Sequence, residues 1–352
     1  MSDQDNNFLT VASNKFKELV NAAADIFDSK DPLMIECYRG YANDKRLYLK
    51  GRVLENENFF DGKSESELRN VLDSLRKFDS DEIPFAKVNI EILNQHFEVK
   101  ADAEGFFVLD TPWEASSISE DTQWIEAVLT LAESIPGYEP MDKQTGEVMY
   151  IGTKAKYGVI TDVDDTVLQT HVTSMFKLRM IYATLSKDAH QRLPMENVVE
   201  VFQKMEKGPK NNDQNPIFYI SNGPWNLHST IKEFMTLHEL PKGPIALRDF
   251  GIVRTDAFEN HKIETQSRII EMFPHLQFIL LGDTADKDTD FYIHIARKYP
   301  NRIKAVYIRQ TRDTENARRI AKTIEESADV NVLLIHSSRE ILEHAKKSGF
   351  IV

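Results

Sequence analysis

The sequence has little cysteine, no long hydrophobic run and no excess of positive charge, and each shortage excludes a class of protein. Cys37 is the only cysteine, so an intramolecular disulfide and a zinc cluster of several thiolates are both excluded. No stretch stays apolar for the ~20 residues of a membrane span, and the first residues lack the basic start and apolar run of a signal peptide. A cytoplasmic location is therefore expected, and any lipid would be reached peripherally, from the water side.

The charge balance argues against polyanionic partners. The net charge of -13 disfavours nucleic acid and strong unaided adhesion to an anionic membrane, because both are negatively charged. It leaves room for one anion in a local cationic pocket. With 352 residues, of which 41% are hydrophobic and 28% charged, the chain is typical of a soluble protein with two domains. The composition does not indicate the oligomeric state.

The first half of the chain predicts mainly strands. Residues 1–30 have the spacing of a packing helix, and residues 64–78 have an amphipathic helical face. Residues 31–150 otherwise show short strand patterns with turn signals, which predict a small antiparallel sandwich or barrel without a catalytic cluster. The candidate strands cover residues 33–38, 47–54, 88–93, 97–101, 106–109, 123–131 and 148–151.

From residue 151 to 352 short apolar strands alternate with helices, which predicts a mostly parallel, Rossmann-like sheet covered on both faces. Ser337 and Glu340 have the spacing of a capping box for the last helix. The candidate strands are 157–161, 217–220, 244–247, 278–281, 305–308 and 332–335, and the candidate helices are 227–237, 262–273, 289–299, 316–327 and 339–348.

Polar side chains follow three of these strands, where open α/β sheets bind their ligands. Asp162, Asp164 and Thr166 follow the first, Ser221 and Asn222 follow the second, and Asp283 with Asp288 follows the fourth; Lys262 is placed at the start of a helix between the last two. Carboxylates from two strand ends suit Mg²⁺, which prefers oxygen ligands, while a hydroxyl and an ammonium group suit phosphate oxygens. Together these residues predict a phosphoryl site.

Other interpretations of the acidic residues are weaker. A calcium loop over Asp286, Asp288 and Asp290 would need glycine where Phe291 stands and glutamate where Arg297 stands. Stabilisation of a helix start by its macrodipole explains Asp286 and Asp290 without any metal. An ordinary solvated turn remains the alternative for the first cluster taken alone. No glycine-rich Walker or dinucleotide motif competes for the phosphate role.

These motifs, in this order, resemble those of the haloacid-dehalogenase-like phosphatases. Within that superfamily the chain is most similar to the actin-patch type phosphatidate phosphatases and their bacterial relatives, over roughly residues 35–310. The narrower resemblance depends on Asp162–Thr166, on Phe218–Leu227, on Leu247-Arg248 and Phe278–Asp283, and upstream on Arg39-Gly40-Tyr41 and Gly51-Arg52-Val53.

The resemblance implies a role for each site residue. Asp162 would be the nucleophile that forms an aspartyl-phosphate, and Asp164 the general acid and base. Mg²⁺ would bind to Asp162, the backbone carbonyl of Asp164, Asp283 and Asp288. The transferring phosphoryl group would be bound by Ser221, Asn222, Lys262, Thr166 and Arg248, while Asp165 is expected to be a bystander.

The resemblance also implies a helical cap, inserted at about residues 168–214, with helical stretches at 171–185 and 194–207. Met175, Phe176, Met180, Tyr182 and Leu185 could form an apolar entrance for acyl chains, although core packing is the commoner role of such a stripe. His171, His228 and Trp225 lie near the motifs and are expected to have no chemical role, with Trp225 packing a helix start.

The favoured function is a magnesium-dependent phosphomonoesterase acting on phosphatidate or a related lipid phosphate, giving diacylglycerol and phosphate. A soluble phosphomonoester or a polynucleotide end is the alternative substrate. A non-catalytic phosphate-binding scaffold is the alternative of another class, although such modules usually have a damaged first motif.

Overall fold

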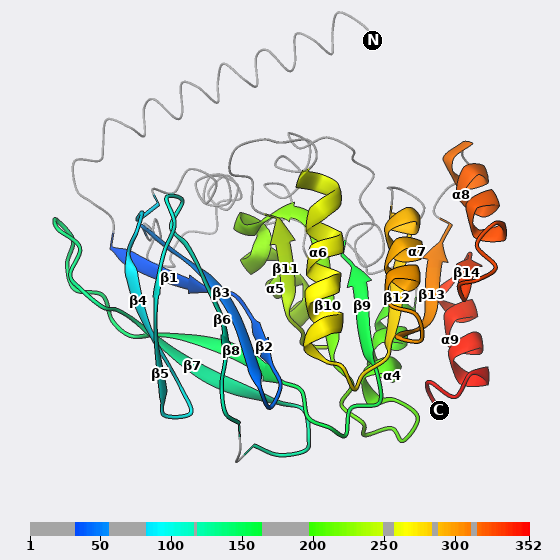
Figure 1. Cartoon of the computed structure of the whole chain (residues 1–352), viewed down its shortest axis with the longest axis horizontal. Helices are drawn as coiled ribbons and strands as arrows, with labels where there is room; N and C mark the ends of the chain where they lie inside the picture. Colours follow the sequence, from blue (N-terminus) through cyan, green and yellow to red (C-terminus); the bar gives the residue numbers. More distant parts are fainter. Residues whose placement is uncertain are drawn as a thin grey trace, which may run out of the picture.

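Figure 1 shows the computed structural model, which describes residues 32–55, 82–115, 118–163, 197–248, 257–283, 288–310 and 315–352. The helices predicted within residues 1–30, 64–78 and 171–185 lie outside these ranges. Within them the chain forms a β-rich half up to residue 150 and a parallel-sheet half from residue 157, which lie side by side in Figure 1. No helix of the described residues is long and apolar enough to cross a membrane.

The β-rich half contains one hydrogen-bonded sheet of eight strands in the order β1-β3-β2-β8-β7-β4-β5, with β6 also paired to β3. All neighbours are antiparallel except β2 and β8, which are parallel. Alternate side chains such as Val88, Ile90 and Ile92 of β4 are buried in one shared core. The strands are β1 (Leu33–Cys37), β2 (Gly40–Ala42), β3 (Arg46–Glu55), β4 (Lys87–Ile92), β5 (Gln95–Lys100), β6 (Phe106–Pro112), β7 (Gln123–Leu131) and β8 (Gln144–Tyr150).

The parallel-sheet half contains six strands in the order β11-β10-β9-β12-β13-β14, and every neighbouring pair is parallel. Counted along the chain within this sheet, the order is 3-2-1-4-5-6, which is the strand order of Rossmann-type doubly wound sheets. The predicted parallel sheet is thus confirmed. The strands are β9 (Gly158–Asp162), β10 (Ile217–Pro224), β11 (Ile245–Arg248), β12 (Phe278–Asp283), β13 (Ile303–Arg309) and β14 (Val332–Ile335).

Helices cover both faces of this sheet because successive strand residues point to opposite sides. One core joins Val159, Tyr219 and Leu281 to α4 (Val198–Lys207), α5 (His228–Leu237) and α9 (Ser338–Lys347). The other joins strand residues such as Ile160 and Phe218 to α6 (Ala257–Met272), α7 (Asp288–Lys298) and α8 (Glu315–Glu325).

The last helix begins with the predicted capping box. Ser337 is the N-cap residue, and its Oγ accepts a hydrogen bond from the backbone N–H of Glu340. The Glu340 carboxylate accepts in turn from the backbone N–H of His336 at 3.2 Å. Two N–H groups at the helix start are therefore satisfied by side chains.

Three local expectations differ from the structure. Strand β2 was not predicted, because three residues are too few to show a period. Lys262 lies in the second turn of α6 rather than at its start, since the helix begins at Ala257. Helix α4, inside the segment assigned to the cap, packs on the sheet through Val201, Phe202 and Met205. The remainder of that segment, up to residue 196, lies outside the described residues.

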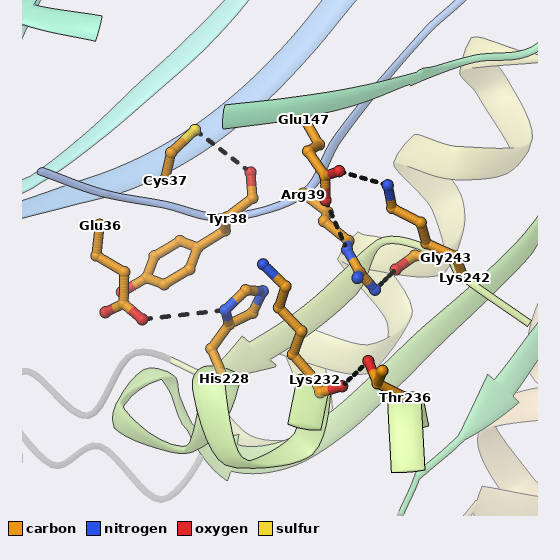
Figure 2. A network of polar contacts seen from close by, with 10 residues as sticks. All are labelled: Glu36, Cys37, Tyr38, Arg39, Glu147, His228, Lys232, Thr236, Lys242 and Gly243. Carbon is orange, nitrogen blue, oxygen red and sulfur yellow. Dashed lines mark hydrogen bonds and ion pairs between the residues drawn. The ribbon is translucent and has the colours of Figure 1, made fainter. Parts of the chain in front are cut away.

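The two halves are joined by side chains of the turn between β1 and β2. Tyr38 is buried against the 3-10 turn η1 (Trp225–Leu227), where it stacks on Trp225 with ring centroids 4.1 Å apart. The Arg39 guanidinium donates to the carbonyl of Gly243 at 3.3 Å and to Glu147 at 3.4 Å (Figure 2). Because Trp225 directly follows β10, which carries Ser221, the β-rich half supports one edge of the predicted site.

The Glu147 carboxylate at this interface predicts a pH dependence. Burial alone would raise its pKa, but the hydrogen bond and charge of Lys242, together with the charge of Arg39, lower it below 4.5. A carboxyl group whose pKa is lower in the folded than in the unfolded chain stabilises the fold at pH values above its usual pKa. This stabilisation is lost as the pH falls through the lowered pKa of the folded state. Glu147→Gln should therefore reduce the melting temperature at neutral pH, with a difference that fades in acid. Glu133→Gln, at an exposed pair with Lys87, is the control and should change little. A difference that stays constant into acid would contradict the assignment.

Candidate active site

The carboxyl ends of β9, β10 and β12 bring three predicted motifs together. Asp162 is the last residue of β9, which lies between β10 and β12 at the point where the strand order reverses. Ile220 is paired with Asp162, so Ser221 lies one residue beyond it on β10. On the other side Leu281 is paired with Thr161, so Asp283 ends β12 two residues further on. This is the position at which open α/β sheets bind ligands.

Asp162 forms a buried ion pair with Lys262 of α6. The Lys262 Nζ donates to Asp162 Oδ1 at 2.7 Å, and the two side chains are only 2% and 3% exposed. Each charge would be costly in the interior without its partner. The pair brings Lys262 to the first motif, although 100 residues separate the two in sequence.

The irregular end of β10, after Ile220, supplies polar groups beside this pair. Ser221 is fully buried, and its Oγ accepts a hydrogen bond from the backbone N–H of Gly223 at 2.9 Å. The buried Oδ1 of Asn222 has no hydrogen-bond partner among the described residues. A rotation of the Asn222 amide by 180° exchanges its oxygen and its NH₂ group. The side chain can therefore present either a hydrogen-bond donor or an acceptor to a ligand.

Arg248 ends β11, which is separated from β9 by β10. It is paired with Pro224 across the sheet and is buried. Burial lowers the pKa of its guanidinium, which still carries a positive charge at neutral pH. Ser221 is thus on the strand next to that of Asp162, whereas Arg248, the predicted phosphate ligand, is one strand further away.

The metal ligands are only partly described. Asp164 and Thr166 lie outside the described residues, as do Asp165, His171 and Asp286. The backbones of Asp283 and Asp288 are placed at the end of β12 and the start of α7. Asp290 forms an ion pair with Arg319 at 3.3 Å, in keeping with a role outside the site. The described residues alone contain no group of three or more His, Cys, Asp or Glu that could bind a metal.

Gly282 allows β12 and α7 to meet closely beside Asp283. A Cβ at this position would lie 2.2 Å from Cε2 of Tyr292, so a larger residue would push the helix away. Tyr292 is buried, and its hydroxyl donates to the carbonyl of Leu281 at 2.9 Å. These contacts position both ends of the fourth motif.

His228 and Trp225 have packing roles. His228 is 3% exposed, and burial with the charges of Arg39 and Lys232 lowers its pKa to about 3, so its ring is neutral. It lies edge-on to Tyr38 at 4.8 Å between centroids, with its Nδ1 4.0 Å from Glu36 (Figure 2). Trp225 packs at a helix start, as predicted, and additionally stacks on Tyr38.

Three side chains near the site escaped the sequence analysis. They are Lys50 of β3 and His261 and Arg268 of α6, which line one cavity between the two halves. Lys50 directly precedes the Gly51-Arg52-Val53 motif, and His261 directly precedes Lys262. Their proximity could not be predicted, because it depends on how β3 packs against α6.

Comparison with known proteins agrees with the motifs. Residues 157–310 match the family model described as "Phosphatidate phosphatase APP1, catalytic domain". The chain is 26% identical to phosphatidate phosphatase APP1 of Saccharomyces cerevisiae over 318 residues, which are 86% of this chain and 51% of the yeast protein. It is also 26% identical to an uncharacterised protein of Schizosaccharomyces pombe, over 60% of this chain and 34% of that protein.

The chain thus spans about half the length of the yeast protein, at 51%, and less of the other relative. Among solved structures, a carbohydrate acetylesterase from Xanthomonas citri is 10% identical over 88% of this chain and 72% of that one, with a TM-score of 0.32. The resemblance that the motifs predicted is confirmed by the family match. Residues 157–310, which match the model of the APP1 catalytic family, include Asp162, Ser221, Lys262 and Asp283.

Proposed function

We propose that this chain hydrolyses phosphomonoesters in a magnesium-dependent reaction through an aspartyl-phosphate, with phosphatidate or a related lipid phosphate as the favoured substrate. The observation that carries the proposal is the buried Asp162–Lys262 pair at the switch point of the sheet. A carboxylate there is desolvated, held in one orientation and adjacent to a cation. The yeast relative's name, phosphatidate phosphatase APP1, supports a lipid phosphate as the substrate class.

In this proposal Asp162 attacks the phosphorus atom, the ester oxygen leaves, and the phosphoryl group is carried on the carboxylate until water displaces it. Asp164 would protonate the leaving oxygen and later deprotonate the water. Lys262 and Ser221 would bind the non-reacting phosphoryl oxygens, where negative charge develops. Asn222, Thr166 and Arg248 would complete the phosphate contacts. Such preorganised charge suits phosphate monoesters, whose uncatalysed hydrolysis is among the slowest known.

Mg²⁺ fits the donor set that the strand ends provide. Asp162 and Asp283 end adjacent parallel strands, and carboxylate oxygens are the ligands that this ion prefers. Asp162, Asp164 and Asp283 would hold it, with Asp288 from the start of α7. When bound, the ion would reduce the repulsion between these carboxylates and a phosphate dianion. Lys262 offsets one of these charges in the structure.

We also propose a helical cap, formed by the part of the 168–214 segment up to residue 196. Helix α4 packs on the sheet, so an apolar entrance would be formed by the stripe of Met175, Phe176, Met180, Tyr182 and Leu185. The β-rich sheet would stiffen the site through Tyr38 and Arg39. From these proposals we expect a cytoplasmic enzyme that binds its lipid substrate at a membrane surface.

A phosphate-release assay over several phosphomonoesters tests the function. Phosphatidate in mixed micelles, a soluble alkyl phosphate and a polynucleotide end would be compared, each with Mg²⁺ and with a chelator. Phosphatidate is expected to turn over fastest, with release falling to background on chelation and returning with Mg²⁺. If the soluble esters were hydrolysed and phosphatidate were not, phosphatidate would be rejected as the substrate. If no ester were hydrolysed, the result would favour the phosphate-binding scaffold.

A further inference from the structure

Trp225, the first residue after β10, is contacted by two side chains of the β-rich half. Tyr38 stacks on its ring, with the centroids 4.1 Å apart and 25° between the ring planes. The Lys50 ammonium lies 4.6 Å from the centroid of the same ring. These two contacts are coupled, because the backbone N–H of Tyr38 donates to the carbonyl of Lys50 at 2.9 Å. One hydrogen-bonded part of the β-rich half therefore fixes the position of Trp225.

Tyr38 packs into the other half of the chain. Its side chain belongs to the core that joins β9, β10 and β12 to their helices, and not to the core of the β-rich sheet. It is 2% exposed and lies edge-on to His228, the first residue of α5, at 4.8 Å between centroids (Figure 2). Stacked and edge-on aromatic pairs at such separations stabilise a contact beyond the burial of their area.

The segment from Ser221 to Leu227 is compact enough to transmit a displacement of Trp225. A Cβ on Gly223 would lie 3.1 Å from Oγ of Ser221 and 3.2 Å from Cδ1 of Leu227. Oγ of Ser221 also accepts a hydrogen bond from the backbone N–H of Gly223. Pro224, whose ring fixes its φ angle, directly links Gly223 to Trp225. A shift of the Trp225 ring is therefore passed on to the Ser221 hydroxyl.

The next residue of the same turn, Arg39, fixes the chain ahead of β11. Its guanidinium donates to the carbonyl of Gly243 at 3.3 Å (Figure 2). Gly243 lies so close to β10 that a Cβ there would be 2.0 Å from a backbone carbonyl oxygen of that strand. Strand β11 ends at Arg248, which is paired with Pro224. The turn between β1 and β2 thus contacts the segments that lead to two of the proposed phosphate ligands, Ser221 and Arg248.

We propose that Tyr38 is a positioning residue of the candidate active site, which through Trp225 holds the Ser221 hydroxyl and the Asn222 amide where they bind the transferring phosphoryl group. This inference rests on the proposed function, and it gives the β-rich half a part in phosphoryl transfer. A misplacement of about 1 Å in an active site can cost ~10²-fold in rate. Because charge develops on the phosphoryl oxygens in the transition state, the loss should fall on kcat and leave KM within a few-fold.

Substitutions of Tyr38 test the role of its ring. Tyr38→Leu should lower kcat for the best ester by about 10–100-fold, whereas Tyr38→Phe keeps the stack and should retain the wild-type rate. Tyr38→His, with a smaller ring, should fall between them. Tyr157→Leu is the matched control, because Tyr157 is 1% exposed but precedes β9 at the end opposite to Asp162. Equal kcat values for Tyr38→Leu and Tyr157→Leu, or equal losses in Tyr38→Leu and Tyr38→Phe, would overturn the inference.

Hydrogen exchange without substrate tests the same coupling independently of the reaction. Tyr38→Leu should speed amide exchange in residues 221–227 by about tenfold and leave residues 278–283 of β12 unchanged. Tyr157→Leu and Tyr38→Phe should leave both segments unchanged, and Tyr38→His replaces Tyr38→Leu if the latter does not fold. Unchanged exchange in residues 221–227 rejects the positioning role. A wild-type chain that hydrolyses no ester rejects the proposed function instead, and the exchange experiment still decides whether Tyr38 positions this segment.

Discussion

Asp162→Asn is expected to lower phosphate release by at least ~10³-fold, the loss expected when a nucleophile in a cooperating site is removed. Asparagine keeps nearly the same shape, but its amide cannot attack phosphorus as a carboxylate does. It also removes the charge that Lys262 neutralises across 2.7 Å. The rate should be measured under saturating substrate and Mg²⁺, with phosphatidate and with the best soluble ester.

Asp165→Asn provides the matched control for this experiment. It removes one carboxylate from the same acidic run, but Asp165 is expected to have no role in the reaction. Its rate should stay within a few-fold of the wild type. Asp162→Asn that keeps its activity, or equal losses in both variants, would show that the first motif does not supply the nucleophile at residue 162.

Lys262→Met is expected to have the second largest effect, on stability as well as on activity. The unfolding free energy should fall by about 3–5 kcal/mol, because Asp162 stays buried without its partner. Loss of a cation that stabilises developing charge should lower kcat by ~10²–10³-fold. Urea denaturation without Mg²⁺ measures the first quantity, and the phosphate-release assay measures the second.

A double mutant separates the buried charge from general damage. Adding Asp162→Asn to Lys262→Met removes the orphaned carboxylate, so most of the lost stability should return. Lys322→Met, at a side chain that is 76% exposed, is the control and should change stability by less than ~0.5 kcal/mol. A double mutant as unstable as Lys262→Met would contradict the ion-pair account.

Much of the parallel-sheet half could be predicted because its strands are buried on both faces. Such strands form short apolar runs, and β10, β12 and β14 were found within a few residues of their observed bounds. The motif order then placed Asp162, Ser221 and Asp283 at one edge, since parallel strands end on the same side of a sheet. The β-rich strands were found by alternation, as in β7, which matches its predicted range.

The contacts between the halves could not be predicted, because no local pattern encodes them. Tyr38 gives no sign in the sequence that it will stack on Trp225, and Lys50 gives none that it will face His261. The helix start at Ala257 was missed because that part of α6 has a weak apolar period, which misplaced Lys262 within its helix. Asp164 and Thr166 stay predictions, since they lie outside the described residues.

The central claim is that the phosphoryl group is carried on the Asp162 carboxylate. Borohydride added to the chain during turnover reduces an acyl phosphate to the alcohol, so trapped aspartyl-phosphate becomes homoserine, which mass spectrometry of peptides can locate. The account predicts homoserine at position 162, dependent on Mg²⁺ and substrate and absent from Asp162→Asn. Homoserine at another aspartate, or none at position 162 while phosphate is released at the full rate, would contradict it.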